Sequence, residues 1–159
     1  MKLLNQAGAV QYVERRSKMQ EIVVFDIDGT LSIISEERRE LIRKRSWDKF
    51  HRLSICAPVN KEVVNALDKH FNEGKIIALI TGRPERWGDC TTHWLEKNNI
   101  SYHILYMRKN GDKRKSYYSK KEHVDKILKS YKIIEAWDDC QQDIDMFESY
   151  GIKTVKVEG

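Results

Sequence analysis

The chain has 159 residues, enough for one domain with a single hydrophobic core, and its apolar and charged fractions are ordinary for a globular protein. No apolar run approaches membrane-spanning length and residues 1–18 lack the apolar core of a secretory signal, so we expect a cytoplasmic protein that does not enter membranes. The net charge is +5, and its basic residues concentrate at 37–45 and 108–121, as in a solvated face or a surface that attracts nucleic acid.

Three cysteines, Cys56, Cys90 and Cys140, are far apart and form no CxxC pair. An odd number of isolated cysteines argues against a disulfide framework and against a zinc site. We therefore expect free thiols, and we expect Cys56 and Cys90 to be packing residues rather than nucleophiles.

The N-terminal segment, residues 1–20, carries apolar residues near helical spacing. We predict a helix that packs on the domain or on a partner chain, which would allow an oligomer. The main domain is predicted to span 21–159, with a small charged insertion, about 33–57, after its first strand.

Strands and helices alternate along the rest of the chain. The predicted strands are 21–26, 75–80, 101–107, 132–139 and 152–157. The predicted helices are one that begins at Pro58 and stops at Gly74, and others at 84–98, 119–130 and 141–150. This order predicts an α/β, Rossmann-like fold, in which helices cover both faces of a mostly parallel sheet.

Polar residues collect where three of these strands end. The first strand ends in Asp26-Ile-Asp28, the second in Thr81-Gly82-Arg83, and the fourth in Asp138-Asp139. The carboxyl ends of parallel strands share one edge of the sheet, where ligands bind in such folds. Carboxylates that meet there repel one another unless a cation lies between them, and oxygen ligands favour Mg²⁺. A lone DxD is usually a solvated turn and a lone DD a helix cap, but three clusters at three strand ends favour a site.

These residues resemble the signature of the haloacid dehalogenase (HAD) superfamily of phosphohydrolases. "DIDGT" matches its DxDx[TV] motif, Thr81 after an apolar strand matches its second motif, and "DDCQQD" its fourth. The resemblance implies that Asp26 is a nucleophile that forms an aspartyl-phosphate and that Asp28 is a general acid. Thr81 and the amide of Gly82 would hold phosphoryl oxygens.

The resemblance also implies a metal site and a lysine. Mg²⁺ would be held by Asp26, by the backbone carbonyl of Asp28 and by Asp139, while Asp138 and Asp143 would orient the metal ligands. The lysine of the third motif would offset the charge of the transferring phosphoryl group.

A narrower resemblance addresses that lysine. "LYMRKNGDKRKSYYSK", "TGRPE" and "EAWDD" are similar to the 3′-phosphatase domain of polynucleotide kinase-phosphatases. Matching the G-D pair implies that Lys120 is the motif lysine, with Lys121 and Lys115 as alternatives, and that Arg83 contacts the phosphate. The family also takes one arginine from the insertion. The chain offers four there: Arg38, Arg39, Arg43 and Arg45.

The chain departs from this family in two places. Ser116 and Tyr117 stand where the family tends to have an acid before the motif lysine. The sequence also lacks the G-x-x-x-x-G-K-[ST] loop of a kinase, so the resemblance implies the phosphatase unit alone.

The small insertion favours an open site, which suits a nucleic-acid end. Trp47 and Trp87 are candidates for stacking on a terminal base, although either could instead cover the core. The leading hypothesis is a Mg²⁺-dependent phosphatase that removes the 3′-phosphate from DNA or RNA ends. The alternatives are a nucleotidase acting on nucleoside monophosphates and, more weakly, a non-enzymatic phospho-acceptor module.

Overall fold

The first strand, β1 (Gln20–Phe25), lies at the centre of a five-stranded sheet. The computed structural model describes residues 19–159, and there the strand order is β3-β2-β1-β4-β5 with every neighbouring pair parallel. The other strands are β2 (Ile76–Pro84), β3 (Ile104–Arg108), β4 (Tyr131–Asp138) and β5 (Thr154–Lys156). The predicted α/β architecture is confirmed, and all five strands end at the same edge.

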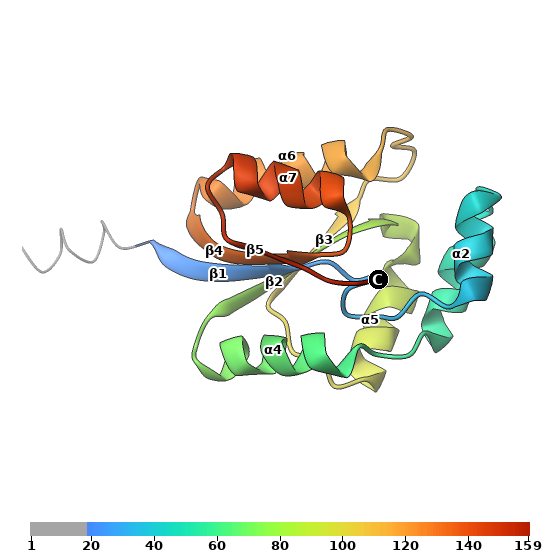
Figure 1. Ribbon diagram of the computed structural model, residues 1–159, viewed down its shortest axis with the longest axis horizontal. Coiled ribbons are helices and arrows are strands. Elements are labelled where there is room, and N and C mark those ends of the chain that lie inside the picture. Colours follow the sequence, from blue (N-terminus) through green and yellow to red (C-terminus); the bar gives the residue numbers. More distant parts are fainter. Residues whose placement is uncertain (1–18) are drawn as a thin grey trace, which may run out of the picture.

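Helices cover both faces of the sheet. Figure 1 shows α6 (Ser116–Leu128) and α7 (Gln141–Ser149) above it, and α4 (Lys61–Asn72) and α5 (Gly88–Lys97) below it. The insertion lies beyond the sheet edge and contains α2 (Glu36–Arg43), α3 (Trp47–Leu53) and the 3₁₀ turn η1 (Ser54–Cys56). A second 3₁₀ turn, η2 (Glu85–Trp87), joins β2 to α5.

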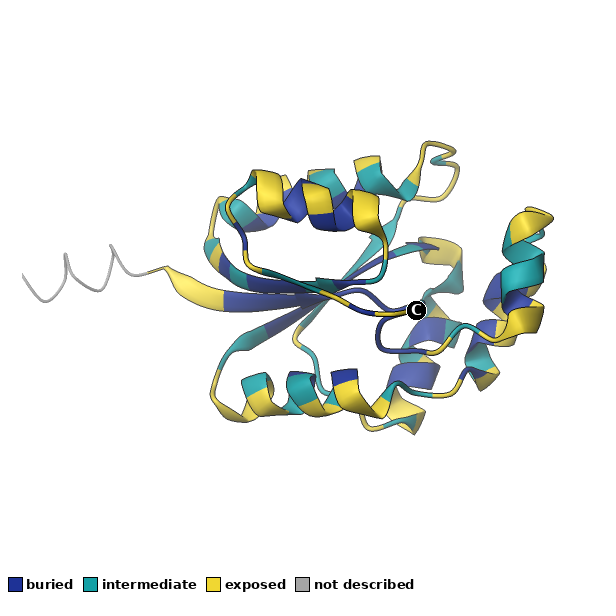
Figure 2. Cartoon of the chain, viewed as in Figure 1, coloured by how far each residue is buried: buried dark blue, intermediate teal, exposed yellow. Residues whose placement is uncertain are grey.

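The apolar run of β1 is explained by burial on both faces, which Figure 2 shows in dark blue. Val23 and Phe25 pack in the core layer that contains residues of α4 and α5. Ile22 and Val24 pack in the layer that contains residues of α6 and α7. Since side chains alternate along a strand, Asp26 continues the series of Ile22 and Val24 toward α6 and α7.

Several element boundaries differ from the predictions. The helix expected from Pro58 begins at Lys61, because backbone hydrogen bonds Ile33 N–Pro58 O (2.9 Å) and Asn60 N–Leu31 O (2.8 Å) tie 58–60 to the loop after β1. The second strand runs on to Pro84, and its pairing with β3 shifts register between Ile80 and Pro84. The third strand begins at 104 and the helix after it at 116, rather than at 101 and 119.

Two further predictions concern the N-terminus and the thiols. The predicted N-terminal helical segment falls outside the described residues, except that Gln20 already belongs to β1. All three cysteines are free thiols, but Cys56 is exposed in η1, so its prediction as a packing residue was wrong. Among residues 19–159, no helix is both long and apolar enough to cross a bilayer.

Candidate active site

The carboxyl ends of β1, β2 and β4 bring the predicted residues together. Asp26 follows β1, Thr81 and Arg83 lie in the last residues of β2, and Asp138 ends β4. These four side chains come from three neighbouring strands and all are buried, with at most 5% of each residue exposed. Because the backbone of a sheet is rigid, their positions are set before any ligand arrives.

Lys120 connects this edge to α6. Its Nζ lies 3.2 Å from Asp26 Oδ1 and 2.7 Å from a carboxylate oxygen of both Asp138 and Asp143. Burial by itself would lower the pKa of Lys120, but the three carboxylates outweigh it and raise that pKa well above its ordinary value. The lysine is therefore a permanent positive charge beside Asp26.

The other two candidate lysines lie elsewhere. Lys121 Nζ donates to the Tyr150 hydroxyl at 2.9 Å and faces Asp125 at 3.7 Å. Lys115 is exposed at the residue that precedes α6. Of the three, the structure thus places Lys120 in contact with Asp26.

Asp26 also accepts a hydrogen bond from the Thr30 hydroxyl, at 3.1 Å. Burial, followed by the negative charges of Asp138, Asp139 and Asp28, raises the pKa of Asp26 well above its usual range, although Lys120 opposes the shift. Sequence reasoning did not assign Thr30 a role. Its signal was present in "DIDGT", where the threonine follows the turn at Gly29 that folds it back onto the strand end.

Asp28 lies in a different environment, between two arginines. Arg83 donates to it through Nε and Nη2, each at 2.8 Å, and Arg38 through Nη2 at 2.6 Å. Burial alone would raise the pKa of Asp28, but Arg83 and then Arg38 hold it well below its ordinary range. Asp28 is therefore ionised in this arrangement.

Of the four insertion arginines, Arg38 is the one that reaches this edge. It is 2% exposed, and its Nε and Nη1 atoms are buried with no hydrogen-bond partner among the described residues. Arg43 instead pairs with Glu36 and Glu40 on the surface of α2. Arg38 follows an N-terminal cap, in which the Ser35 side chain accepts from the Arg38 backbone N–H at 3.2 Å.

Thr91 is a second residue that sequence reasoning missed. Its hydroxyl accepts from Arg83 Nη1 at 3.1 Å and donates to the Trp87 carbonyl at 2.8 Å. It is fully buried in α5 and fixes the guanidinium of Arg83. No sequence pattern pointed to it, since it lies eight residues after Arg83, beyond η2 on α5.

The acidic cluster is suited to a divalent metal ion. Carboxylate oxygens of Asp26, Asp138 and Asp139 lie within 4.8 Å of one another. Burial and the charge of Asp138 raise the pKa of Asp139 to about 6, which shows the repulsion that a cation would relieve. Gly29 takes φ +84°, and a Cβ there would lie 2.1 Å from Asp139 Oδ2, so only glycine allows Asp139 this position.

Asp138 and Asp143 each bind Lys120 through one carboxylate oxygen, and their second oxygens differ in surroundings. Asp138 Oδ2 binds Lys120, and its Oδ1 accepts from the Cys140 backbone N–H at 3.0 Å. Asp143 Oδ1, in contrast, is buried with no hydrogen-bond partner among the described residues. The supporting role of Asp138 and Asp143 around a metal stays a prediction.

Comparison with solved structures identifies the class of protein that this fold and site define. A class C acid phosphatase from Bacillus anthracis, solved with tungstate bound, matches at TM-score 0.66 and 16% identity. The match covers 96% of this chain and 72% of the phosphatase chain, so the two share a fold. A chain of a Pnkp1/Rnl/Hen1 complex matches at TM-score 0.76 and 26% identity. With the family profile that matches the chain, these matches define a HAD-type phosphatase.

The sequence profile described as "Polynucleotide kinase PNKP phosphatase domain" matches residues 20–159, and the chain belongs to this family. The Pnkp1/Rnl/Hen1 match covers 89% of this chain and 47% of the matched chain. A second match, to a chain of a Pnkp1/Rnl/Hen1 RNA repair complex, has the same TM-score of 0.76 and 26% identity, and covers 87% of this chain and 42% of the matched chain. The chain thus spans less than half the length of these relatives. No curated protein sequence matches it.

Proposed function

We propose that this chain is a Mg²⁺-dependent phosphomonoesterase that removes 3′-phosphate from polynucleotide ends through an aspartyl-phosphate. The observation that carries the proposal is the contact between Asp26 and Lys120, with Arg83 and Arg38 on the adjacent Asp28. A carboxylate, a lysine and two arginines at one sheet edge provide a nucleophile and a cradle of three positive charges for a phosphoryl group. The family, and the RNA repair complex named for a relative, support a nucleic-acid end as substrate.

In the first step, a carboxylate oxygen of Asp26 attacks phosphorus. The bond from phosphorus to the leaving 3′-oxygen breaks, and its electron pair stays on that oxygen. Asp28 donates a proton to the same oxygen, which leaves the polynucleotide with a 3′-hydroxyl. Lys120, at 3.2 Å from Asp26, balances the charge that collects on the phosphoryl oxygens.

Asp28 can donate that proton only when it is released from its two arginines, which hold it ionised in this structure. An incoming phosphate offers Arg83 and Arg38 a more highly charged partner than one carboxylate. When the guanidinium groups bind phosphoryl oxygens, the two positive charges that lower the pKa of Asp28 are shared, so its pKa rises. Substrate binding and acid activation would then be coupled.

In the second step, water attacks the phosphorus of the aspartyl-phosphate. The Asp28 carboxylate takes one proton from this water, the bond from phosphorus to Asp26 breaks, and its electron pair returns to the carboxylate. Inorganic phosphate leaves and both aspartates regain their starting states. Asp26 and Asp139, with the backbone carbonyl of Asp28, would hold Mg²⁺, which supplies charge neutralisation for the phosphoryl oxygens.

The decisive experiment compares one oligonucleotide with a 3′-phosphate, the same oligonucleotide with a 5′-phosphate, a 3′-mononucleotide and p-nitrophenyl phosphate. Each is assayed for phosphate release with Mg²⁺ and with EDTA. We expect the 3′-phosphorylated oligonucleotide to have the highest kcat/KM, its KM to rise with salt, and EDTA to stop turnover. Faster turnover of mononucleotides than of oligonucleotides would instead establish the nucleotidase alternative.

A further inference from the structure

Trp47, at the start of α3, is an exposed aromatic side chain with a rigid support. It is 46% exposed, although tryptophan usually buries most of its surface. Its indole meets the Phe50 ring edge-on at 5.8 Å and stacks on His51 at 6.4 Å with an interplanar angle of 27°. Phe50 and His51 are buried, so the exposed indole is held on the fixed wall of the insertion.

The rings that support Trp47 also pack near Arg38 and Arg83, the two arginines proposed to bind phosphate. The Arg38 guanidinium lies over the Phe50 ring, 4.2 Å from its centroid, and also binds Asp28. His51 packs against Trp87 at 5.7 Å, and the Trp87 carbonyl holds the hydroxyl that fixes Arg83. A single ring, that of Phe50, therefore separates Trp47 from Arg38.

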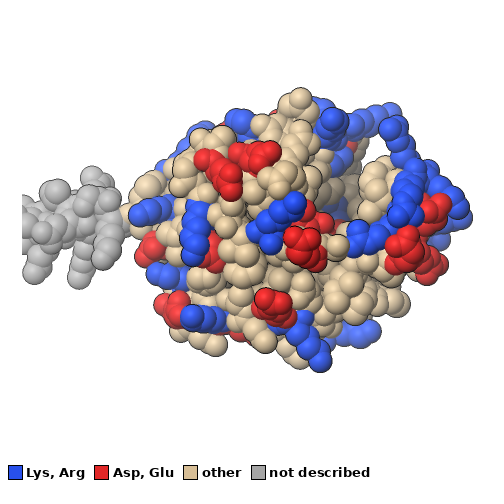
Figure 3. Space-filling view, in the orientation of Figure 1, with Lys and Arg blue, Asp and Glu red and all other residues tan. Residues whose placement is uncertain are grey.

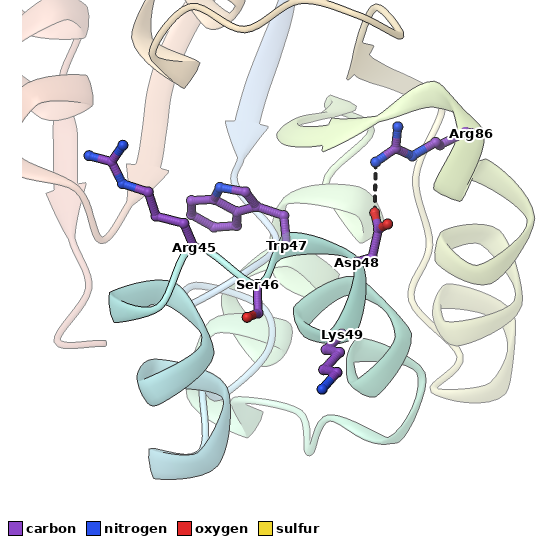
Figure 4. Close-up of a pocket in the computed structure, with 6 residues that line it drawn as sticks. All are labelled: Arg45, Ser46, Trp47, Asp48, Lys49 and Arg86. Carbon is purple, nitrogen blue, oxygen red and sulfur yellow. Dashed lines mark hydrogen bonds and ion pairs between the residues drawn. The ribbon is translucent and has the colours of Figure 1, made fainter.

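A groove of about 450 Å³ runs past Trp47. It is lined by Arg45, Ser46, Trp47, Asp48, Lys49 and Arg86. Figure 4 shows the indole beside the Arg45 side chain, with the Asp48–Arg86 ion pair (2.8 Å) on its other side and Lys49 pointing away from it. Figure 3 shows lysine and arginine side chains gathered at this end of the molecule, near α2 and the segment before α6.

Arg45 has an unusual backbone for its residue type. Its φ is +53°, in the left-handed region that favours glycine, directly after the end of α2. Its N–H donates to Ile42 O at 3.0 Å, and that of Ser46 to Leu41 O at 2.9 Å, which closes the helix. Glycine would take this position more easily, so the arginine costs stability and a role for its guanidinium would explain it.

We propose that Trp47 stacks on a base beside the scissile 3′-phosphate and that Arg45 binds the backbone phosphate of the same strand. The inference rests on the proposed function and adds the contacts by which the protein would distinguish a polynucleotide end from a mononucleotide. An exposed indole provides a stacking face for any base, while the net positive groove complements the strand. The open groove leaves room for the chain to continue away from the site.

The first test uses a 3′-phosphorylated oligonucleotide and a matched one that lacks the bases of its last two nucleotides. The wild-type kcat/KM should be higher for the complete strand. In Trp47→Ala this preference should fall about tenfold, and Trp47→Phe should retain most of it. The control is Phe71→Ala, which removes another partly exposed ring. Phe71 stacks on His103, just before the start of β3 and not at the carboxyl ends of the strands, so this variant should keep the wild-type preference.

The second test measures how kcat/KM for the complete strand depends on salt. Arg45→Gly should reduce the slope of log kcat/KM against log salt by about 0.7, the value for one contact to a single strand. The melting temperature should not fall, because glycine suits the left-handed backbone. The control is Lys129→Ala, which removes an exposed charge at the C-terminal end of α6, away from the groove, and should leave the slope unchanged.

The outcomes separate this inference from the function on which it rests. If the wild-type protein hydrolyses 3′-phosphorylated oligonucleotides but Trp47→Ala keeps the full preference for bases, the stacking role is wrong. An unchanged salt slope in Arg45→Gly would remove the phosphate contact. If the wild-type protein does not hydrolyse 3′-phosphorylated oligonucleotides, the proposed function itself fails.

Discussion

Asp26 and Asp28 are two residues apart and both are largely enclosed, but their surroundings act on them in opposite directions. Asp26 faces one lysine and a group of other carboxylates, which together with burial raise its pKa. Asp28 is bound by two arginines, which lower its pKa despite burial. The same residue type thus acquires two different proton affinities at one sheet edge, as different catalytic roles require.

The difference arises from where each side chain is directed. Asp26 still follows the alternation of β1 and points toward the layer of α6 and α7, which carries Lys120 and Asp143. Asp28 lies after the strand has ended, and meets Arg83 from β2 and Arg38 from α2. One side of the site is built on the sheet and its helices, and the other is completed by the insertion.

The largest expected effect comes from breaking the Asp26 side. Asp26→Asn should lower kcat by more than about 10⁴-fold, because the amide has no nucleophilic carboxylate oxygen. The similar shape of asparagine should leave the fold intact. Phosphate release and circular dichroism check both points, and substantial residual turnover would contradict the aspartyl-phosphate mechanism.

Asp28→Asn should separate the two aspartates. It should lower kcat by about 10²–10⁴-fold, because proton transfer is lost while the nucleophile remains. With p-nitrophenyl phosphate, whose leaving group needs little protonation, a burst of nitrophenolate should precede slow turnover. Acid quenching should then recover phosphate covalently attached to Asp26, and its absence would argue against Asp28 as the base of the second step.

Lys120→Met should damage both stability and activity. It leaves the carboxylates of Asp138 and Asp143 buried without their partner, a loss of about 3–5 kcal/mol in the free energy of unfolding. Lys121→Met and Lys115→Met remove charges from the surface and should change the free energy of unfolding far less. Urea unfolding measures the change in stability, and kcat measures the change in activity. Equal losses in all three variants would contradict the assignment of Lys120 as the lysine of the site.

Arg38→Ala should raise KM by about 10–100-fold, because a buried guanidinium contact with phosphate is worth about 1.5–3 kcal/mol. Arg43→Ala, on the exposed surface of the same helix, is the matched control and should stay within about twofold. Michaelis–Menten kinetics with p-nitrophenyl phosphate distinguish the two. A larger rise in KM from Arg43→Ala than from Arg38→Ala would show that Arg38 is not the insertion arginine of the site.

The smallest effect concerns the metal site. The pKa of Asp139 is about 6 in the folded chain against an ordinary 3.8, so without metal the folded state keeps a proton that the unfolded state has lost, and stability should fall as pH rises from 3.8 to 6. Mg²⁺ binds the ionised group, so it should raise the melting temperature by about 3 °C above pH 6 and by less below it. Melting curves in EDTA and in Mg²⁺ measure this.

Asp139→Asn is the control for the metal prediction. It should remove the gain from Mg²⁺ and make the fall in stability between pH 3.8 and 6 smaller. A wild-type melting temperature that ignores Mg²⁺ at every pH would show that the acidic cluster does not hold this ion.

The sequence by itself determined the sheet and the place of the site. Alternating strands and helices allow few other topologies, and parallel strands must end at one edge, so Asp26, Thr81 and Asp138 had to meet. Only the tertiary structure decided which lysine and which arginine join them. Lys120 and Lys121 are neighbours on one helix, as are Arg38 and Arg39, and each pair differs by about 100° around the axis. Which face turns inward depends on how α6 and α2 pack, and the packing of α3 likewise leaves Trp47 exposed.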